Sequence, residues 1–212
     1  MTPSTFWNKA AKGYAKRPIA DTESYEYTLG RTRSYLTPTD HVLEMGCGTG
    51  STALRLADAA GRITASDFSS EMLAIGAQKA KAQGIDNVDF VSADIETGDL
   101  AGQSFDMVCA FNVLHLVQDL DAAITGIAAK VRPGGLFISK SPCLSEPALG
   151  FKFRLMMLAV PVLQAFGKAP FVGRFSIAEL EHSITSAGFE IIETGNHPAQ
   201  PPARYIVARK QA

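Results

Sequence analysis

A buried-strand pattern that runs directly into a cluster of glycines constrains the fold of this chain more than any other feature. Residues 42–50 read Val-Leu-Glu-Met-Gly-Cys-Gly-Thr-Gly, and a helical pattern begins at Thr52. Glycines permit a tight turn with positive φ and let a ligand approach the backbone without a Cβ in the way. A strand, a glycine turn and a helix in this order are typical of a parallel sheet with a ligand at the turn.

The rest of the chain repeats this alternation of β-like runs and helical patterns, which predicts an α/β fold with a mostly parallel sheet. A capping box of Ser176 and Glu179 begins a C-terminal helix, and Gly188 fits its end. Pro133, Gly134 and Gly135 are expected to stop the helix before them. The expected strands are 41–45, 62–66, 88–92, 105–111, 136–139, 190–194 and 205–208, and the expected helices between them are 52–59, 70–83 and 120–131.

Composition narrows the class of protein. With 212 residues, 46% of them hydrophobic and 19% charged, residues 1–212 are expected to form a single globular domain. A net charge of -1 lacks the positive excess of a typical nucleic-acid-binding protein. Three cysteines at irregular spacing predict neither a disulfide framework nor a metal site, so a cytoplasmic location is expected. The longest apolar run, 155–163, is far shorter than the ~20 residues that span a bilayer.

Glu44 indicates the charge of the ligand at the glycine turn. It stands two residues before Gly46, the first glycine of the turn. A pyrophosphate prefers free N–H groups and no nearby anion, whereas a carboxylate suits a ligand with a positive charge. In addition, the third glycine of a dinucleotide-binding motif is missing, because Ser51 stands at its position. Both features argue against a dehydrogenase.

Acidic residues follow the next two expected strands. Asp67 lies about twenty residues past the glycine turn, where a carboxylate can accept from both hydroxyls of a ribose. Its alternative role is to favour the start of the next helix. Asp94 can accept from an exocyclic amino group, while Ile95 and Phe68 offer apolar faces to a purine. The alternative for Asp94 is a surface loop.

In this order and spacing, the motifs resemble the class I S-adenosylmethionine-dependent methyltransferases. The resemblance also includes Phe105-Asp106-Met107-Val108 and Val131-Arg132-Pro133-Gly134-Gly135-Leu136. It implies a Rossmann-like sheet of seven strands with an antiparallel last strand, helices on both faces, and S-adenosyl-L-methionine as cofactor. Residues 40–140 would form the cofactor-binding core, after an N-terminal helical lid at 1–36 and before a substrate-side insert at 143–175 and C-terminal elements at 176–212. The implied cofactor-binding residues are Glu44, Gly46, Cys47, Gly48 and Gly50 near the methionine end, Asp67 at the ribose, Asp94, Ile95 and Phe68 at the adenine, and Asn112 and Tyr14.

The residues after the fourth expected strand bear on the methyl acceptor. Asn112-Val113-Leu114-His115 differs from the Asn-Pro-Pro-Tyr pattern of methyltransferases that act on amino groups of nucleic acids. His115 is a candidate base or acceptor-binding group, and a packing residue is its alternative. RNA cytosine methyltransferases carry a second Pro-Cys motif after the fourth strand, which this chain lacks. Cys143 is therefore expected to be an ordinary apolar thiol.

The expected function is methyl transfer to a small, apolar molecule, as in the ubiquinone- and menaquinone-biosynthesis methyltransferases, without a nucleic-acid partner. Two alternatives remain open: a cofactor-binding partner subunit without turnover, and a lipid methyltransferase working at a membrane surface. The apolar stretch 155–166, flanked by cationic residues, leaves three roles open for the insert. These are an acceptor pocket, a homodimer face through 151–171, and a peripheral contact with anionic membrane.

Overall fold

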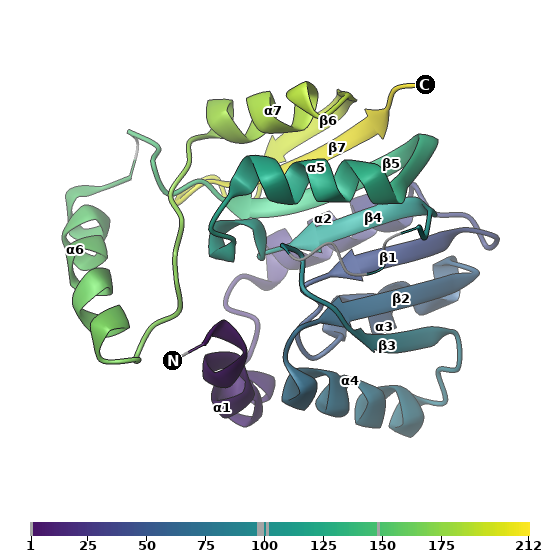
Figure 1. Ribbon diagram of the computed structural model, residues 1–212, viewed down its shortest axis with the longest axis horizontal. Coiled ribbons are helices and arrows are strands. Elements are labelled where there is room, and N and C mark those ends of the chain that lie inside the picture. The colour runs from purple at the N-terminus through teal and green to yellow at the C-terminus, as the bar shows by residue number, and fades with distance from the viewer. Residues whose placement is uncertain (1, 97–99, 101, 148) are drawn as a thin grey trace.

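The computed structural model describes residues 2–96, 100, 102–147 and 149–212, apart from the side chains of residues 151–154 and 156. Seven strands form one sheet in the order β3-β2-β1-β4-β5-β7-β6 (Figure 1). β7 runs antiparallel to both β5 and β6, and every other neighbouring pair is parallel. This confirms the predicted seven-stranded sheet. The strands are β1 (His41–Met45), β2 (Arg62–Asp67), β3 (Val88–Ser92), β4 (Phe105–Phe111), β5 (Val131–Pro142), β6 (Phe189–Asn196) and β7 (Ala203–Lys210).

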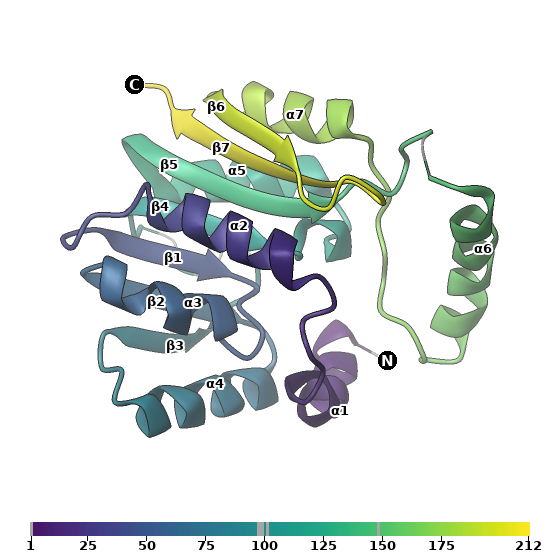
Figure 2. The same ribbon diagram turned by 180° about the vertical axis from the view of Figure 1, so that it is seen from behind.

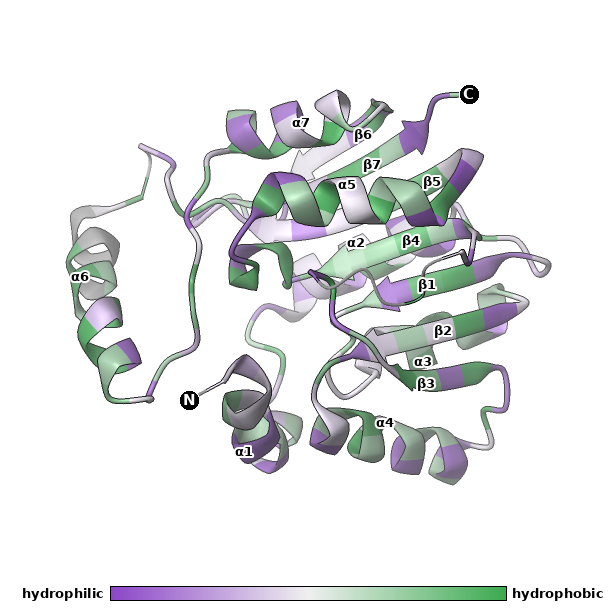
Figure 3. Cartoon of the chain, viewed as in Figure 1, coloured by the Kyte–Doolittle hydropathy of each residue, from purple (hydrophilic) through white to green (hydrophobic). Residues whose placement is uncertain are grey.

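Helices cover both faces of the sheet, as predicted. On one face α2, α3 and α4 enclose an apolar cluster that includes Leu29, Leu54 and Leu73 (Figure 2). On the other face α5 and α7 enclose a second cluster around Ile124 and Ile184. Coloured by hydropathy, β4 is apolar along most of its length, whereas β3 alternates between apolar and hydrophilic residues (Figure 3). The bounds are α1 (Pro3–Ala15), α2 (Thr22–Arg33), α3 (Ser51–Leu56), α4 (Ser70–Gln83), α5 (Leu120–Lys130), α6 (Phe151–Ala165) and α7 (Ile177–Ser186), with short 3-10 turns η1 (Ala57–Ala59) and η2 (Leu114–Leu116).

The predicted boundary between α5 and β5 is wrong. The helix ends at Lys130, because Val131 already pairs with Phe105 in the sheet, and β5 therefore begins five residues earlier than expected. Lys210, at the end of β7, stabilises this junction: its Nζ donates to the carbonyl oxygens of Ala128 and Val131 at 2.6 and 2.8 Å. Cationic side chains commonly satisfy the last carbonyls of a helix in this way.

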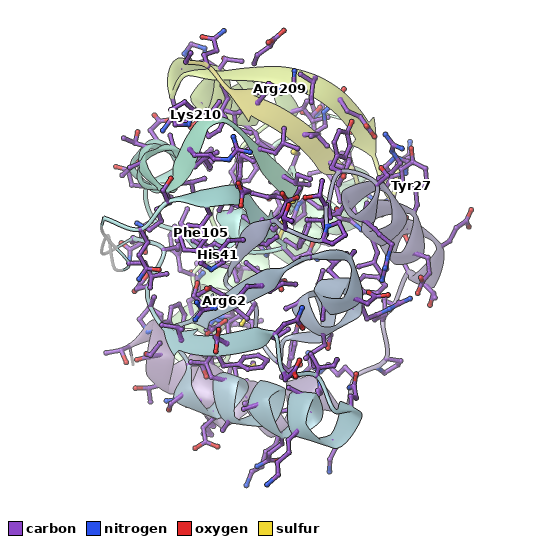
Figure 4. All side chains as sticks on the ribbon, turned by 90° about the vertical axis from the view of Figure 1, so that its right-hand side faces the viewer. Tyr27, His41, Arg62, Phe105, Arg209 and Lys210 are labelled. Atoms are coloured by element: carbon purple, nitrogen blue, oxygen red, sulfur yellow. The ribbon has the colours of Figure 1, made fainter. Side chains whose placement is uncertain are left out.

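The two ends of the parallel strands have different characters. At the N-terminal ends, the rings of His41 and Phe105 pack with centroids 4.6 Å apart (Figure 4). His41 thus lies at the edge opposite the glycine turn. The turn after Met45 and the residues after Asp67 and Phe111 all lie at the C-terminal edge, where ligands bind in open α/β sheets.

Three segments outside the common core lie toward this C-terminal edge. α1 packs on α4, α2 lies over the sheet beside β4 and β5, and α6 stands apart from the sheet (Figures 1 and 2). The insert therefore consists of one helix joined to the core by extended segments. Among the described residues, no helix has the length and apolarity needed to cross a bilayer.

Candidate functional site

The glycine turn and Asp67 form one hydrogen-bonded unit. Gly46, Gly48 and Gly50 have φ values of +66°, +55° and +69°, which only glycine adopts without strain. The N–H of Gly48 donates to Oδ2 of Asp67 at 2.9 Å, and the N–H of Ser69 donates to Oδ1 at 2.8 Å. Burial raises the pKa of Asp67, although these backbone donors favour its charged form. The carboxylate is thus held in a fixed orientation beside the turn.

Glu44 is a buried carboxylate with an unused acceptor. Its side chain lies on the α3 face of β1, and the residue is only 4% exposed. Burial raises its pKa to about 8, while the N–H of Ala53 and the nearby Asp67 have smaller, opposing effects. Its Oε2 has no hydrogen-bond partner among the described residues. An unpaired buried carboxylate at this place fits a cationic ligand.

Tyr14 covers the glycine turn. Its Cε1 lies 3.7 Å from the position that a Cβ on Gly48 would occupy. Burial raises its pKa, and the charges of Glu44 and Asp67 raise it further. Asn8 ties α1 to the core, because its Oδ1 accepts from the hydroxyl of Ser69 at 2.7 Å. The predicted lid residue therefore lies directly over the loop.

The other residues predicted at the cofactor differ in their surroundings. Asp94 follows β3, and its Oδ1 accepts from the N–H of Glu96 at 3.0 Å. Ile95 is 9% exposed and packs in the core cluster beneath α5, and Phe68 is partly buried. Cys47 is buried within the turn, and burial raises the pKa of its thiol well above the ordinary value. The adenine-side roles of Asp94, Ile95 and Phe68 stay predictions.

The loop after β4 brings Asn112 and His115 to the same edge. Asn112 adopts φ +54°, and its N–H donates to the carbonyl of Lys140 at 2.7 Å. His115 lies in η2, where burial lowers its pKa to about 4 and leaves Nδ1 without a hydrogen-bond partner in the described part of the chain. Its carbonyl accepts from Gly173 of the insert at 2.8 Å. His115 is therefore a neutral imidazole at the junction of core and insert.

Cys143 has the properties of an ordinary buried thiol. It is fully buried, its Sγ donates to the carbonyl of Ser141 at 3.7 Å, and burial raises its pKa to about 12. A thiolate is the reactive form of cysteine, so this environment opposes a nucleophilic role. Within the described ranges, no three His, Cys, Asp or Glu side chains come together to hold a metal ion.

Several residues at this edge carry no signal in the sequence. Lys79 of α4 donates from Nζ to the hydroxyls of Thr49 and Ser51 at 2.8 and 3.2 Å, which anchors the turn from outside. Lys140 and Tyr25 line a cavity of about 30 Å³ between α2 and the ends of β4 and β5. These contacts join segments far apart in the chain, so only the fold reveals them.

The insert borders a larger, open cavity of about 360 Å³. Apolar side chains from the segment after β5 and from α6 form most of its walls, and a carboxylate and a guanidinium lie at its lining. The lining residues are Leu144, Ser145, Glu146, Leu149, Met157, Leu158 and Arg174. Among the cationic residues that flank the apolar stretch 155–166 in sequence, Lys152 and Arg154 have side chains outside the described part of the structure.

Comparison with known proteins agrees with this geometry. Residues 42–135 match the family described as "Methyltransferase domain". A ubiquinone biosynthesis O-methyltransferase of Agrobacterium fabrum is 32% identical over 153 residues, which cover 71% of this chain and 60% of the relative. A demethylmenaquinone methyltransferase of Geobacillus kaustophilus is 32% identical over 132 residues, covering 59% and 55%. The chain spans less than two thirds of the length of these relatives.

Solved structures share the fold over nearly the whole chain. The N-methyltransferase NodS from Bradyrhizobium japonicum, in complex with S-adenosylhomocysteine, superposes with a TM-score of 0.74 at 15% identity, covering all of both chains. Residues 42–135 are thus similar to a methyltransferase domain, and the sheet with its glycine turn has the fold of the class I S-adenosylmethionine-dependent methyltransferases. S-adenosylmethionine is the cofactor of that class. The bare Cα of Gly48 and the unpaired Oε2 of Glu44 fit such a cationic ligand.

Proposed function

We propose that the protein transfers a methyl group from S-adenosylmethionine to a small acceptor with an apolar body. The observation that carries the proposal is the unit formed by the glycine turn, Asp67 and the unpaired carboxylate of Glu44. S-adenosylmethionine supplies a methyl group bound to a positively charged sulfur. The residues of this chain bind and orient the cofactor and the acceptor, and they exclude water.

Each contribution follows from the environment of its residue. Glu44 neutralises the positive end of the cofactor, since its carboxylate has an acceptor to spare in a buried place. Asp67 accepts from the ribose hydroxyls, for which its two oxygens are already oriented by Gly48 and Ser69. Tyr14 and α1 cover the turn and keep water from the reacting atoms.

The acceptor side lies between η2 and the insert. Transfer of a methyl group is an in-line displacement, so placing the nucleophile is the main task. His115, neutral at pH 7, lies at this junction and is the candidate base for an acceptor that must lose a proton. The cavity of about 360 Å³ beneath α6 supports an acceptor with an apolar body. The quinone-pathway names of the relatives support the same class.

The exposed face of α6 supports a second candidate, in which the acceptor is a lipid reached at a membrane surface. Leu155, Leu158, Val162 and Phe166 are 57%, 69%, 58% and 75% exposed. A contiguous apolar helix face of this kind suits the boundary of a bilayer. Flotation with anionic liposomes separates the candidates: the membrane candidate requires flotation, and a protein that stays in the dense fraction excludes it. A partner subunit without turnover and a dehydrogenase have no such support.

Calorimetry with the purified chain tests the proposed function. S-adenosylmethionine is expected to bind with a micromolar or lower Kd and to raise the Tm. NAD is expected neither to bind nor to change the Tm. Stabilisation by NAD alone would overturn the proposal.

A further inference from the structure

Lys140 is a buried cation with few partners. It lies near the C-terminal end of β5, beside Phe111 of β4, and is only 8% exposed. Among the described residues, its Nζ has one hydrogen-bond partner, the carbonyl of Ser24, at the long distance of 3.5 Å. That carbonyl already accepts from the hydroxyl of Thr28 at 2.9 Å. An ammonium has three donors, so Lys140 is poorly satisfied by the residues around it.

The charges near Lys140 do not pair with it. Within the described residues, no carboxylate oxygen lies within 4 Å of its Nζ. Asp21 is close enough to favour the charged lysine, but its Oδ1 caps α2 by accepting from the N–H of Ser24 at 3.0 Å. His197, between β6 and β7, has its pKa lowered by burial and by Lys140. A buried ammonium without a counter-ion is costly unless a ligand supplies one.

Tyr25 lines the same cavity. Its hydroxyl is buried and has no hydrogen-bond partner among the described residues, and the Arg55 guanidinium lies 5.5 Å from the centroid of its ring. With Lys140, Thr28, Phe111 and Asn112, it lines the cavity of about 30 Å³. A cavity of this size admits an oxygen atom but no aromatic ring. The side chains of Lys140 and Tyr25 therefore both border space for a single oxygen.

The position of this cavity connects it to the reaction. Thr52, at the start of α3, also lines this cavity, and α3 begins directly after Gly50 of the glycine turn. Asn112 closes the other side, with its N–H bonded to the carbonyl of Lys140. The cavity thus lies between the cofactor turn and the ends of β4 and β5, where the acceptor must enter.

We propose that Lys140 and Tyr25 bind an acidic oxygen of the methyl acceptor, so that the acceptor is a phenol or a carboxylic acid with an apolar body. The inference rests on the proposed function and narrows its substrate class. Lys140 neutralises the oxygen's negative charge, and the Tyr25 hydroxyl donates to it. The apolar body then lies outside the small cavity, which cannot hold it.

Binding of 4-nitrophenol tests the proposal without turnover, because its phenolate absorbs visible light and its phenol does not. With S-adenosylhomocysteine present, the wild-type chain is expected to bind 4-nitrophenol as the phenolate and to lower its pKa by about one unit, a tenfold preference for the anion. Lys140→Met, which removes the charge at similar volume, should abolish this shift and weaken binding at least tenfold. Tyr25→Phe should weaken it several-fold, and Lys140→Arg should restore part of the shift.

Controls separate this inference from the proposed function. The exposed Lys81→Met variant should bind 4-nitrophenol like wild type, and all variants should keep wild-type affinity for S-adenosylmethionine by calorimetry. Competition by benzoate, but not by nitrobenzene, would identify a carboxylic acid; failure of benzoate to compete would identify a phenol. Equal binding of 4-nitrophenol by wild type and Lys140→Met, with cofactor binding intact, would overturn the inference alone. Loss of cofactor binding by wild type would overturn the proposed function.

Discussion

The backbone N–H of Gly48 donates to Oδ2 of Asp67 over 2.9 Å, so the turn after β1 and the carboxylate after β2 are one structural unit. The same carboxylate accepts from Ser69 at the start of α4. A change at Asp67 therefore affects both the predicted ribose contact and the shape of the turn.

Asp67→Ala is expected to weaken binding of S-adenosylmethionine at least about 100-fold, since charge-assisted hydrogen bonds contribute about 1.5–3 kcal/mol each and several are lost. Calorimetry measures the affinity. Asp58→Ala removes an exposed carboxylate that pairs with Arg33 and should leave the affinity unchanged. Near-normal affinity of Asp67→Ala would remove this residue from the ribose role.

The raised pKa of Glu44 predicts that cofactor binding releases a proton. Burial raises its pKa to about 8, so the carboxyl is protonated at pH 7, and a bound cation favours the ionised form. Below pH 8 the affinity should therefore rise with pH, by up to about tenfold per unit. Calorimetry at pH 7 in two buffers with different ionisation heats should give different binding heats. Glu44→Gln should bind more weakly and give the same heat in both buffers, and equal heats for wild type would refute this role.

His115 predicts a loss of stability in mild acid. Its folded pKa of about 4 lies below the ordinary value of 6.5, so the unfolded chain binds more protons between these values. Its contribution is complete above pH 6.5 and is lost as the pH falls toward 4, by up to about 3 kcal/mol. Urea melts across this range should show a shallower loss for His115→Gln than for wild type, whereas the exposed His182→Gln should follow wild type. Parallel curves for His115→Gln and wild type would contradict the burial of His115.

Two glycines with the same backbone conformation predict different costs of substitution. Gly46 and Gly84 have φ values of +66° and +67°, but a Cβ on Gly46 would collide with the side chain of Val113, while a Cβ on Gly84 meets nothing within 4 Å. Gly84→Ala should cost about 1–2 kcal/mol of folding free energy, from backbone strain alone. Gly46→Ala should cost about 3 kcal/mol or more in the same urea melts. Equal costs would mean that the turn at Gly46 shifts to accommodate a side chain.

The sequence predicts the core of the fold because local signals and tertiary structure agree there. β1, β3 and β4 have the expected bounds, and the Ser176–Glu179 capping box begins α7 as predicted. The start of β5 is missed because Val131 continues a helical pattern and leaves it only to pair with Phe105. Such pairing depends on a strand 26 residues away, which periodicity does not report.

The residues of the site likewise fall into those that sequence motifs reveal and those that only the fold brings together. The glycine turn and Asp67 are adjacent to strand ends and are visible as motifs, and Tyr14 lies where the resemblance implies a lid. Lys140 and Tyr25 line one cavity only because α2 lies over the ends of β4 and β5, and no motif links them. The role of α6 cannot be assigned from its sequence, because a helix that is apolar nearly all round suits a pocket, a dimer and a membrane alike.

Transfer of a labelled methyl group tests the central claim most directly. Wild type and Asp67→Ala are incubated with methyl-labelled S-adenosylmethionine and a cell extract, and lipid, small-molecule, protein and RNA fractions are separated. We expect label in the small-molecule or lipid fraction with wild type and at least about 100-fold less with Asp67→Ala, following the loss of binding. Label confined to protein or RNA, or equal labelling by both chains, would contradict it.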